Sequence, residues 1–71
     1  MPKRPALHDL LHETRVRKGL SVQDISEQVG VTPAAVYGWE VGRNRPREEN
    51  LKALCRVLKL PIRATLELAA A

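Results

Sequence analysis

Between positions 21 and 42 the sequence carries two sets of helix start and stop signals, separated by a single residue. Residues 21–24 read Ser-Val-Gln-Asp, a pattern in which the serine and the aspartate three positions later form a capping box. Gly30 can end that helix in the left-handed conformation open to glycine. After Val31, Thr32 is a helix cap and Pro33 occupies the first helical position, where its missing N–H costs nothing. We therefore expect two short helices joined by a tight turn.

Apolar side chains recur at helical spacing before and after this stretch, and no run alternates with period two. The three stripes comprise Leu7, Leu10, Leu11 and Thr14; Leu51, Leu54, Cys55 and Leu58; and Ile62, Leu66 and Ala69. The sequence thus predicts an all-α fold, a compact bundle of five short helices. Since a turn containing glycine joins the second helix to the third, these two form a helix-turn-helix. We expect the domain to span residues 6–69, behind a flexible N-terminal arm of residues 1–5.

The charge of the chain favours an anionic partner. Its 71 residues contain 12 Lys and Arg against 8 Asp and Glu, for a net charge of +4. Cys55 is the only cysteine, which excludes an internal disulfide and fits a reducing cytoplasm. We find no signal peptide and no stretch near the roughly 20 apolar residues of a membrane span, so we expect no membrane partner. The short length predicts no separate effector-binding domain, and regulation would come through concentration, dimerisation or a partner.

The third predicted helix has one face for the core and another that is small and nearly uncharged. Val36 and Trp39 share the core face, with Glu40 beside them. The residues of the other side are Pro33, Ala34, Tyr37 and Gly38. We expect that side to be free to enter a groove. Its small side chains would let the helix backbone approach a duplex closely.

A series of short motifs runs along the chain between residues 7 and 66. They are Leu20-Ser21, Asp24-Ile25-Ser26, Val29-Gly30-Val31-Thr32, Val36, Trp39-Glu40, Gly42, Arg45-Pro46, Asn50-Leu51, Leu54 and Leu58. In this order and spacing they resemble the lambda-repressor-like family, the helix-turn-helix proteins of the phage Cro and repressor type. The resemblance implies a transcriptional regulator, a repressor that binds double-stranded DNA as a homodimer on a palindromic operator. The third helix would lie in the major groove and the second across the DNA backbone.

Carried over position by position, the resemblance assigns DNA contacts to both sides of the turn. The base-facing positions are Pro33, Ala34, Tyr37 and Gly38, and the positions facing the DNA backbone are Gln23, Thr32, Arg43, Asn44 and Arg45. Arg15 and Glu40 match an ion pair that ties the first helix to the third.

The chain departs from the family pattern at several of these positions. Val22 stands where a polar residue is usual, with Gln23 one step later, and Lys59 replaces a common helix-capping glycine. The base-facing set contains no Gln, Asn or Arg, so bidentate recognition of adenine or guanine is not expected from it. We expect apolar contact and DNA shape to carry the recognition instead, with Ala34 and Pro33 meeting thymine methyl groups. The Tyr37 hydroxyl would either read a base directly or contact phosphate.

Other functions require different features of the chain. His8 and His12 have the i, i+4 spacing of metal ligands, but only distant Cys55 offers a third, so we expect no metal or other cofactor. We find no glycine-rich phosphate loop, Ser-His-Asp set or carboxylate pair and expect no enzyme. The alternatives are the antitoxin of a toxin–antitoxin pair and a protein-interaction module that does not bind DNA. The dependence of binding on salt concentration distinguishes the protein-interaction module from the DNA-binding alternatives, because counterion release weakens DNA binding steeply as salt rises.

Overall fold

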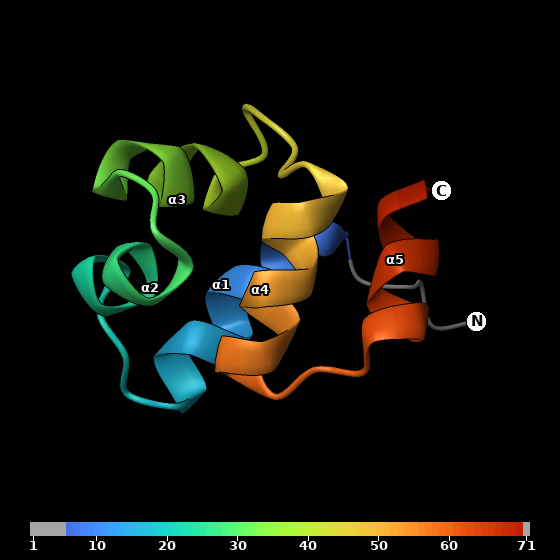
Figure 1. Ribbon diagram of the computed structural model, residues 1–71, viewed down its shortest axis with the longest axis horizontal. Helices are drawn as coiled ribbons and strands as arrows, with labels where there is room; N and C mark the ends of the chain where they lie inside the picture. The colour runs from blue at the N-terminus through green and yellow to red at the C-terminus, as the bar shows by residue number, and fades with distance from the viewer. Residues whose placement is uncertain (1–5, 71) are drawn as a thin grey trace.

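Five helices make up the computed structural model, which describes residues 6–70 and confirms the all-α fold predicted from the sequence (Figure 1). They are α1 (Leu7–Arg17), α2 (Val22–Val29), α3 (Pro33–Glu40), α4 (Glu48–Leu58) and α5 (Ile62–Ala70). Helices α2 and α3 lie together at one end of the molecule, α5 lies at the other end, and α1 and α4 lie between them. The predicted N-terminal arm, residues 1–5, lies outside the described residues.

The helix start and stop signals around the turn have the expected geometry. Ser21 Oγ accepts a hydrogen bond from the Asp24 N–H at 3.0 Å, and Asp24 Oδ2 accepts one from the Ser21 N–H at 2.9 Å. The bond from the Ser21 backbone lowers the pKa of the Asp24 carboxyl. Gly30 ends α2 with φ 87°, and Thr32 Oγ1 caps α3 by accepting from the Ala35 N–H at 3.2 Å. Only residues 30–32 connect the two helices, so these local bonds fix the direction of α3 relative to α2.

Lys59 adopts the left-handed conformation that glycine usually supplies after a helix. Its φ is 57°, and the Leu60 N–H donates to the Cys55 carbonyl at 2.9 Å, the bond that closes such a helix end. A side chain in this conformation costs roughly 1–2 kcal/mol. The chain still turns between α4 and α5 at this position. Lysine in place of the usual glycine at position 59 therefore does not prevent the bend between these two helices.

A single apolar core lies where α1, α2, α3 and α4 meet. Its buried members are Leu11, Ile25, Val36, Trp39, Leu51, Leu54 and Leu58. The stripe predicted for α4 is entirely buried, Cys55 included. The apolar spacing predicted α5 correctly as a helix, but its buried residue is Thr65, 2% exposed, whereas Ile62 is 38% exposed. Thr65 can be buried because its hydroxyl is satisfied locally, by the Pro61 carbonyl 2.7 Å away.

Thr14 and Thr65 are both buried, but their hydroxyl groups differ in hydrogen bonding. Thr14 Oγ1 has no hydrogen-bond partner among the described residues. Thr14→Val keeps the shape of the side chain and removes a hydroxyl whose burial without a partner costs roughly 1–3 kcal/mol. We expect this substitution to raise the free energy of unfolding, measured by urea denaturation, by about 1 kcal/mol.

Thr65→Val is the matched control, since it removes a hydrogen bond that is made. It should lower the free energy of unfolding by about 1 kcal/mol. Destabilisation of similar size by both substitutions would show that the Thr14 hydroxyl has a partner.

Candidate nucleic-acid interface

A buried carboxylate fixes α3 against α1. Glu40, the last residue of α3, has a side chain only 6% exposed. Its Oε2 accepts from Arg15 Nε at 2.7 Å and its Oε1 accepts from Arg15 Nη2 at 3.0 Å. Two parallel bonds of this kind fix orientation as well as distance. Arg15 Nη1 also donates to the Leu20 carbonyl at 2.9 Å, so the predicted ion pair is present and also holds the segment leading into α2.

His12 is a third partner of the same carboxylate, and the sequence analysis missed it. Its Nδ1 lies 2.8 Å from Glu40 Oε1. An ionised carboxylate only accepts hydrogen bonds, so we assign the proton of the imidazole to Nδ1, which donates. The 3.4 Å approach of Arg15 Nη2 to that nitrogen is then a contact between two donors and not a bond. The available signal was the i, i+3 spacing of His12 and Arg15 on α1, which puts both on one face.

Glu40 remains ionised in spite of its burial. Burial raises its pKa, but the hydrogen bonds from Arg15 and His12, with the charge of Arg15, lower it by more, and the pKa lies below its usual value. The same hydrogen bond raises the pKa of Arg15. The tie between α1 and α3 is therefore ionic at neutral pH.

The exposed side of α3 carries no charge, and its side chains are small except for Tyr37. Pro33, Ala34 and Tyr37 are exposed, and Tyr37 stands out at 55%. Val41 extends this side just beyond the helix and is 46% exposed. The sequence analysis missed Val41, although its i+4 spacing from Tyr37 is a sufficient signal. We call these four residues the reading face.

Gly38 does not belong to the reading face, and the expectation that it is free to enter a groove is wrong. It is buried because the Asn44 carboxamide covers it, and a Cβ at Gly38 would stand 2.9 Å from Asn44 Nδ2. The chain after α3 folds back to make this contact. The N–H groups of Arg43 and Asn44 both donate to the Gly38 carbonyl, at 2.9 and 3.2 Å. This reversal joins residues six positions apart and has no periodic signal in the sequence.

The residues expected to face the DNA backbone are all exposed. They are Gln23, Thr32, Arg43, Asn44 and Arg45. On α2, Gln23 Nε2 donates to Glu27 Oε2 at 3.3 Å, which places a carboxylate beside it. Thr32 uses its oxygen to cap α3 and keeps its own O–H as a donor. Gln23 lies on α2, Thr32 lies at the start of α3, and the other three residues lie in the loop after α3.

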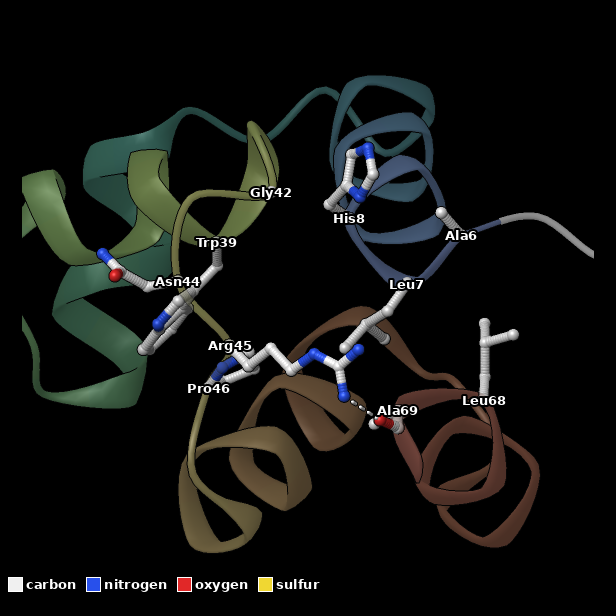
Figure 2. A pocket seen from close by; sticks show the side chains of 10 residues that line it. All are labelled: Ala6, Leu7, His8, Trp39, Gly42, Asn44, Arg45, Pro46, Leu68 and Ala69. Carbon is white, nitrogen blue, oxygen red and sulfur yellow. Dashed lines mark hydrogen bonds between the residues drawn. The ribbon is translucent and has the colours of Figure 1, made fainter. Parts of the chain in front are cut away.

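Arg45 extends from the loop towards α5 (Figure 2). Its Nη1 donates to the Ala69 carbonyl at 2.9 Å, near the C-terminal end of α5, where a cation is favoured by the helix dipole. Asn44 and Arg45 leave the loop in opposite directions, Asn44 towards α3 and Arg45 towards α5. The loop, α1 and α5 surround a pocket of about 370 Å³, which Trp39 also lines. Arg45 therefore has a structural contact that the sequence did not predict.

The residues considered for metal binding lie in three different environments. The His8 ring packs on Gly42, with Nδ1 3.1 Å from where a Cβ would stand. His12 bonds to Glu40, and Cys55 is buried in α4. Within residues 6–70, no three His, Cys, Asp or Glu side chains form a group that could hold a metal ion. In the same range, no helix is both long enough and apolar enough to cross a membrane.

Comparison with known proteins gives concordant matches. A family model described as helix-turn-helix matches residues 11–64. The transcriptional regulator ClgR of Mycobacterium tuberculosis is 30% identical over 63 residues, which cover 89% of this chain and 56% of the relative. The chain thus spans little more than half the length of the curated relatives it matches.

Solved structures agree with this match. Two crystal structures of the clp gene regulator ClgR from Corynebacterium glutamicum have TM-scores of 0.79 and 0.77 to this fold. Their sequence identities are 28% and 30%. The matches cover 97% and 99% of this chain and 77% and 92% of those chains.

Neutralising Glu40 should destabilise the fold strongly, because its carboxylate joins α1 to α3. Glu40→Gln keeps the side-chain volume and leaves the Arg15 guanidinium without its charged partner. Removing one partner of a buried pair costs roughly 3–5 kcal/mol, and since the Arg15 side chain is 15% exposed we expect a loss of about 3 kcal/mol. Urea denaturation at neutral pH measures this loss.

Glu13→Gln on the exposed surface of α1 removes the same charge and should change stability by less than about 0.5 kcal/mol. Acid titration is a second check. Because folding lowers the pKa of Glu40, its contribution is complete above the unfolded-state pKa of about 4.3 and is lost as the pH falls through the folded-state value. The stability difference between wild type and Glu40→Gln should therefore shrink below about pH 4. A difference that stays constant through that range would contradict an ionic tie.

Proposed function

Because this chain belongs to the helix-turn-helix family, we propose that it is a cytoplasmic, sequence-specific DNA-binding transcriptional regulator, a repressor whose α3 enters the major groove of its operator. The observation that carries the proposal is the reading face, which is exposed, uncharged and supported from behind by the core and by the Arg15–Glu40 pair. A match to ClgR, itself a transcriptional regulator, supports it. The net charge of +4 favours an anionic partner.

Phosphate contacts at both ends of α3 would fix its register on DNA. At the N-terminal end, the Thr32 O–H can donate to a phosphate oxygen, and the helix dipole favours negative charge there. Beyond the C-terminal end, Arg43 supplies a guanidinium. Gln23 on α2 is a weaker anchor because its amide already bonds to Glu27, whose charge repels phosphate.

We propose that the bases are recognised mainly through apolar contact. Pro33, Ala34 and Val41 have no hydrogen-bonding side chain, and Tyr37 contributes a single hydroxyl. The thymine methyl is the apolar mark of the major groove, so this surface favours A·T pairs. A small surface also brings the helix backbone close, which makes binding sensitive to groove shape.

Two copies would act together as a homodimer on a palindromic operator, with the two α3 helices in successive major grooves about 34 Å apart. The small size of the reading face supports this arrangement. One α3 has eight residues and meets few base pairs, each worth about 1–3 kcal/mol of discrimination. A second half-site multiplies that discrimination.

The experiment that tests the function is a selection from random DNA duplexes, followed by a salt titration of the enriched sequence. We expect two related half-sites and an affinity that falls steeply with salt. An antitoxin would show the same DNA binding and would also copurify with a protein partner. Failure to enrich any sequence would overturn the proposal and favour a protein-interaction module.

Arg43 should anchor phosphate without carrying sequence information. Arg43→Ala should weaken binding to all duplexes alike and lower the slope of log affinity against log salt by about 1. Arg63→Ala is the control, since it removes the same charge from α5, at the opposite end of the molecule from α3, and should leave the slope unchanged (Figure 1). A changed base preference in Arg43→Ala would show that this residue reads sequence. Arg45→Ala should weaken DNA binding in the same way as Arg43→Ala. It should also destabilise the fold, because it removes the bond to the Ala69 carbonyl.

Ala34 should meet thymine methyl groups. Replacing thymine by uracil, one position at a time in the selected operator, removes only the methyl. Burial of a methyl-sized group is worth about 0.8 kcal/mol, so affinity should fall roughly fourfold at one or two positions in each half-site. In Ala34→Gly that difference should disappear.

Ala64→Gly makes the same exchange at an exposed position of α5 and should retain the response to uracil. This control separates the loss of a contact from the cost of glycine in a helix. If no position responds to the methyl in the wild type, apolar recognition is excluded and the polar groups beside α3 must carry the specificity.

A further inference from the structure

The reading face has no side chain that can form two hydrogen bonds with one base, yet the structure holds such a group directly beside it. Gly38, at a position assigned to base contact, has no side chain of its own. The Asn44 carboxamide lies over it, with Nδ2 2.9 Å from where a Cβ would stand. The amide therefore fills the space in which the side chain of residue 38 would begin.

Backbone contacts hold Asn44 in this position from both sides. Its own N–H donates to the Gly38 carbonyl at 3.2 Å, and the N–H of the preceding Arg43 donates to the same oxygen at 2.9 Å. On the other side, the Arg45 side chain is bound to the Ala69 carbonyl, and Pro46 restricts the backbone that follows. The backbone of Asn44 is thus placed before any ligand arrives, which reduces the entropy lost on binding.

The carboxamide is exposed and has free hydrogen-bonding capacity. Within residues 6–70, the Asn44 side chain makes no hydrogen bond to another protein group. It offers one acceptor, Oδ1, and one donor group, Nδ2. A phosphate has acceptors only and would use just the donor. The major-groove edge of adenine presents the N6 donor and the N7 acceptor side by side, and so matches both atoms.

We propose that Asn44 reads an adenine in the major groove, in the place of a side chain at position 38. Gly38 and Asn44 then act as one recognition unit: the glycine leaves the space and the loop residue fills it with a carboxamide. This role replaces the DNA-backbone contact that the family resemblance implies for Asn44. The inference rests on the proposed DNA-binding function.

The first test replaces each adenine of the selected operator by 7-deazaadenine, which keeps base pairing and removes the N7 acceptor. A bidentate pair gives about 1–3 kcal/mol of discrimination, so losing one of its bonds should weaken wild-type binding about fivefold at one position per half-site. Asn44→Ala should bind more weakly and show no response at that position. Arg43→Ala, the neighbouring matched control, should bind more weakly but keep the response.

The second test is a double-mutant cycle between positions 38 and 44. In Gly38→Ala the new Cβ would lie too close to Nδ2 and must displace the carboxamide, while alanine is the better helix former and the fold is retained. Gly38→Ala should therefore abolish the 7-deazaadenine response, as Asn44→Ala does. In the Asn44→Ala background it should have no further effect on DNA affinity, because there is no carboxamide to displace.

The outcomes separate this inference from the proposed function. If no sequence is enriched from random duplexes, the proposed function fails and the inference fails with it. If an operator is found but Asn44→Ala weakens all duplexes alike and keeps the 7-deazaadenine response, Asn44 contacts phosphate and only the inference is overturned. If Gly38→Ala weakens binding equally with and without Asn44, residue 38 meets DNA directly and the recognition unit is wrong.

Discussion

The carboxylate of Glu40 is the interaction on which the position of α3 depends. It lies at the junction of α1 and α3, ionised although buried, and receives hydrogen bonds from Arg15 and His12. Arg15 also donates a hydrogen bond to the Leu20 carbonyl, so the guanidinium that binds Glu40 also positions the segment leading into α2. Val36 and Trp39 anchor this helix in the apolar core, and the ionic tie with its two parallel bonds adds a fixed orientation at the C-terminal end of the helix.

The other side of α3 carries no charge, and its exposed side chains are small except for Tyr37. A surface of this kind can approach a groove closely but has little hydrogen-bonding capacity. The loop after α3 supplies that capacity from outside the helix, since the Asn44 carboxamide lies over Gly38. The adjacent Arg45 turns to α5, so this loop links the recognition side of the molecule to its far end (Figure 2).

Much of the fold follows from local rules that act within a few residues. The capping box at Ser21, the left-handed Gly30 and the Thr32 cap depend on neighbours at most four positions away, and all have the expected geometry. Periodicity predicted the buried stripe of α4 correctly for the same reason. It also predicted α5 correctly as a helix but did not identify its buried residue, Thr65, because apolar spacing does not reveal a hydroxyl that is satisfied by a nearby carbonyl.

The sequence by itself determined the five helices, the tight turn between α2 and α3, and the small, uncharged character of the reading face, since each depends on short-range spacing and residue type. The family resemblance gave one distant contact, between Arg15 and Glu40, and the tertiary structure decided which other distant groups meet. The bond from His12 to Glu40 spans 28 positions, and that from Arg45 to Ala69 spans 24. The burial of Gly38 likewise depends on where a non-periodic loop folds back. Such contacts arise when the packed helices bring polar groups together, and no local pattern in the chain encodes them.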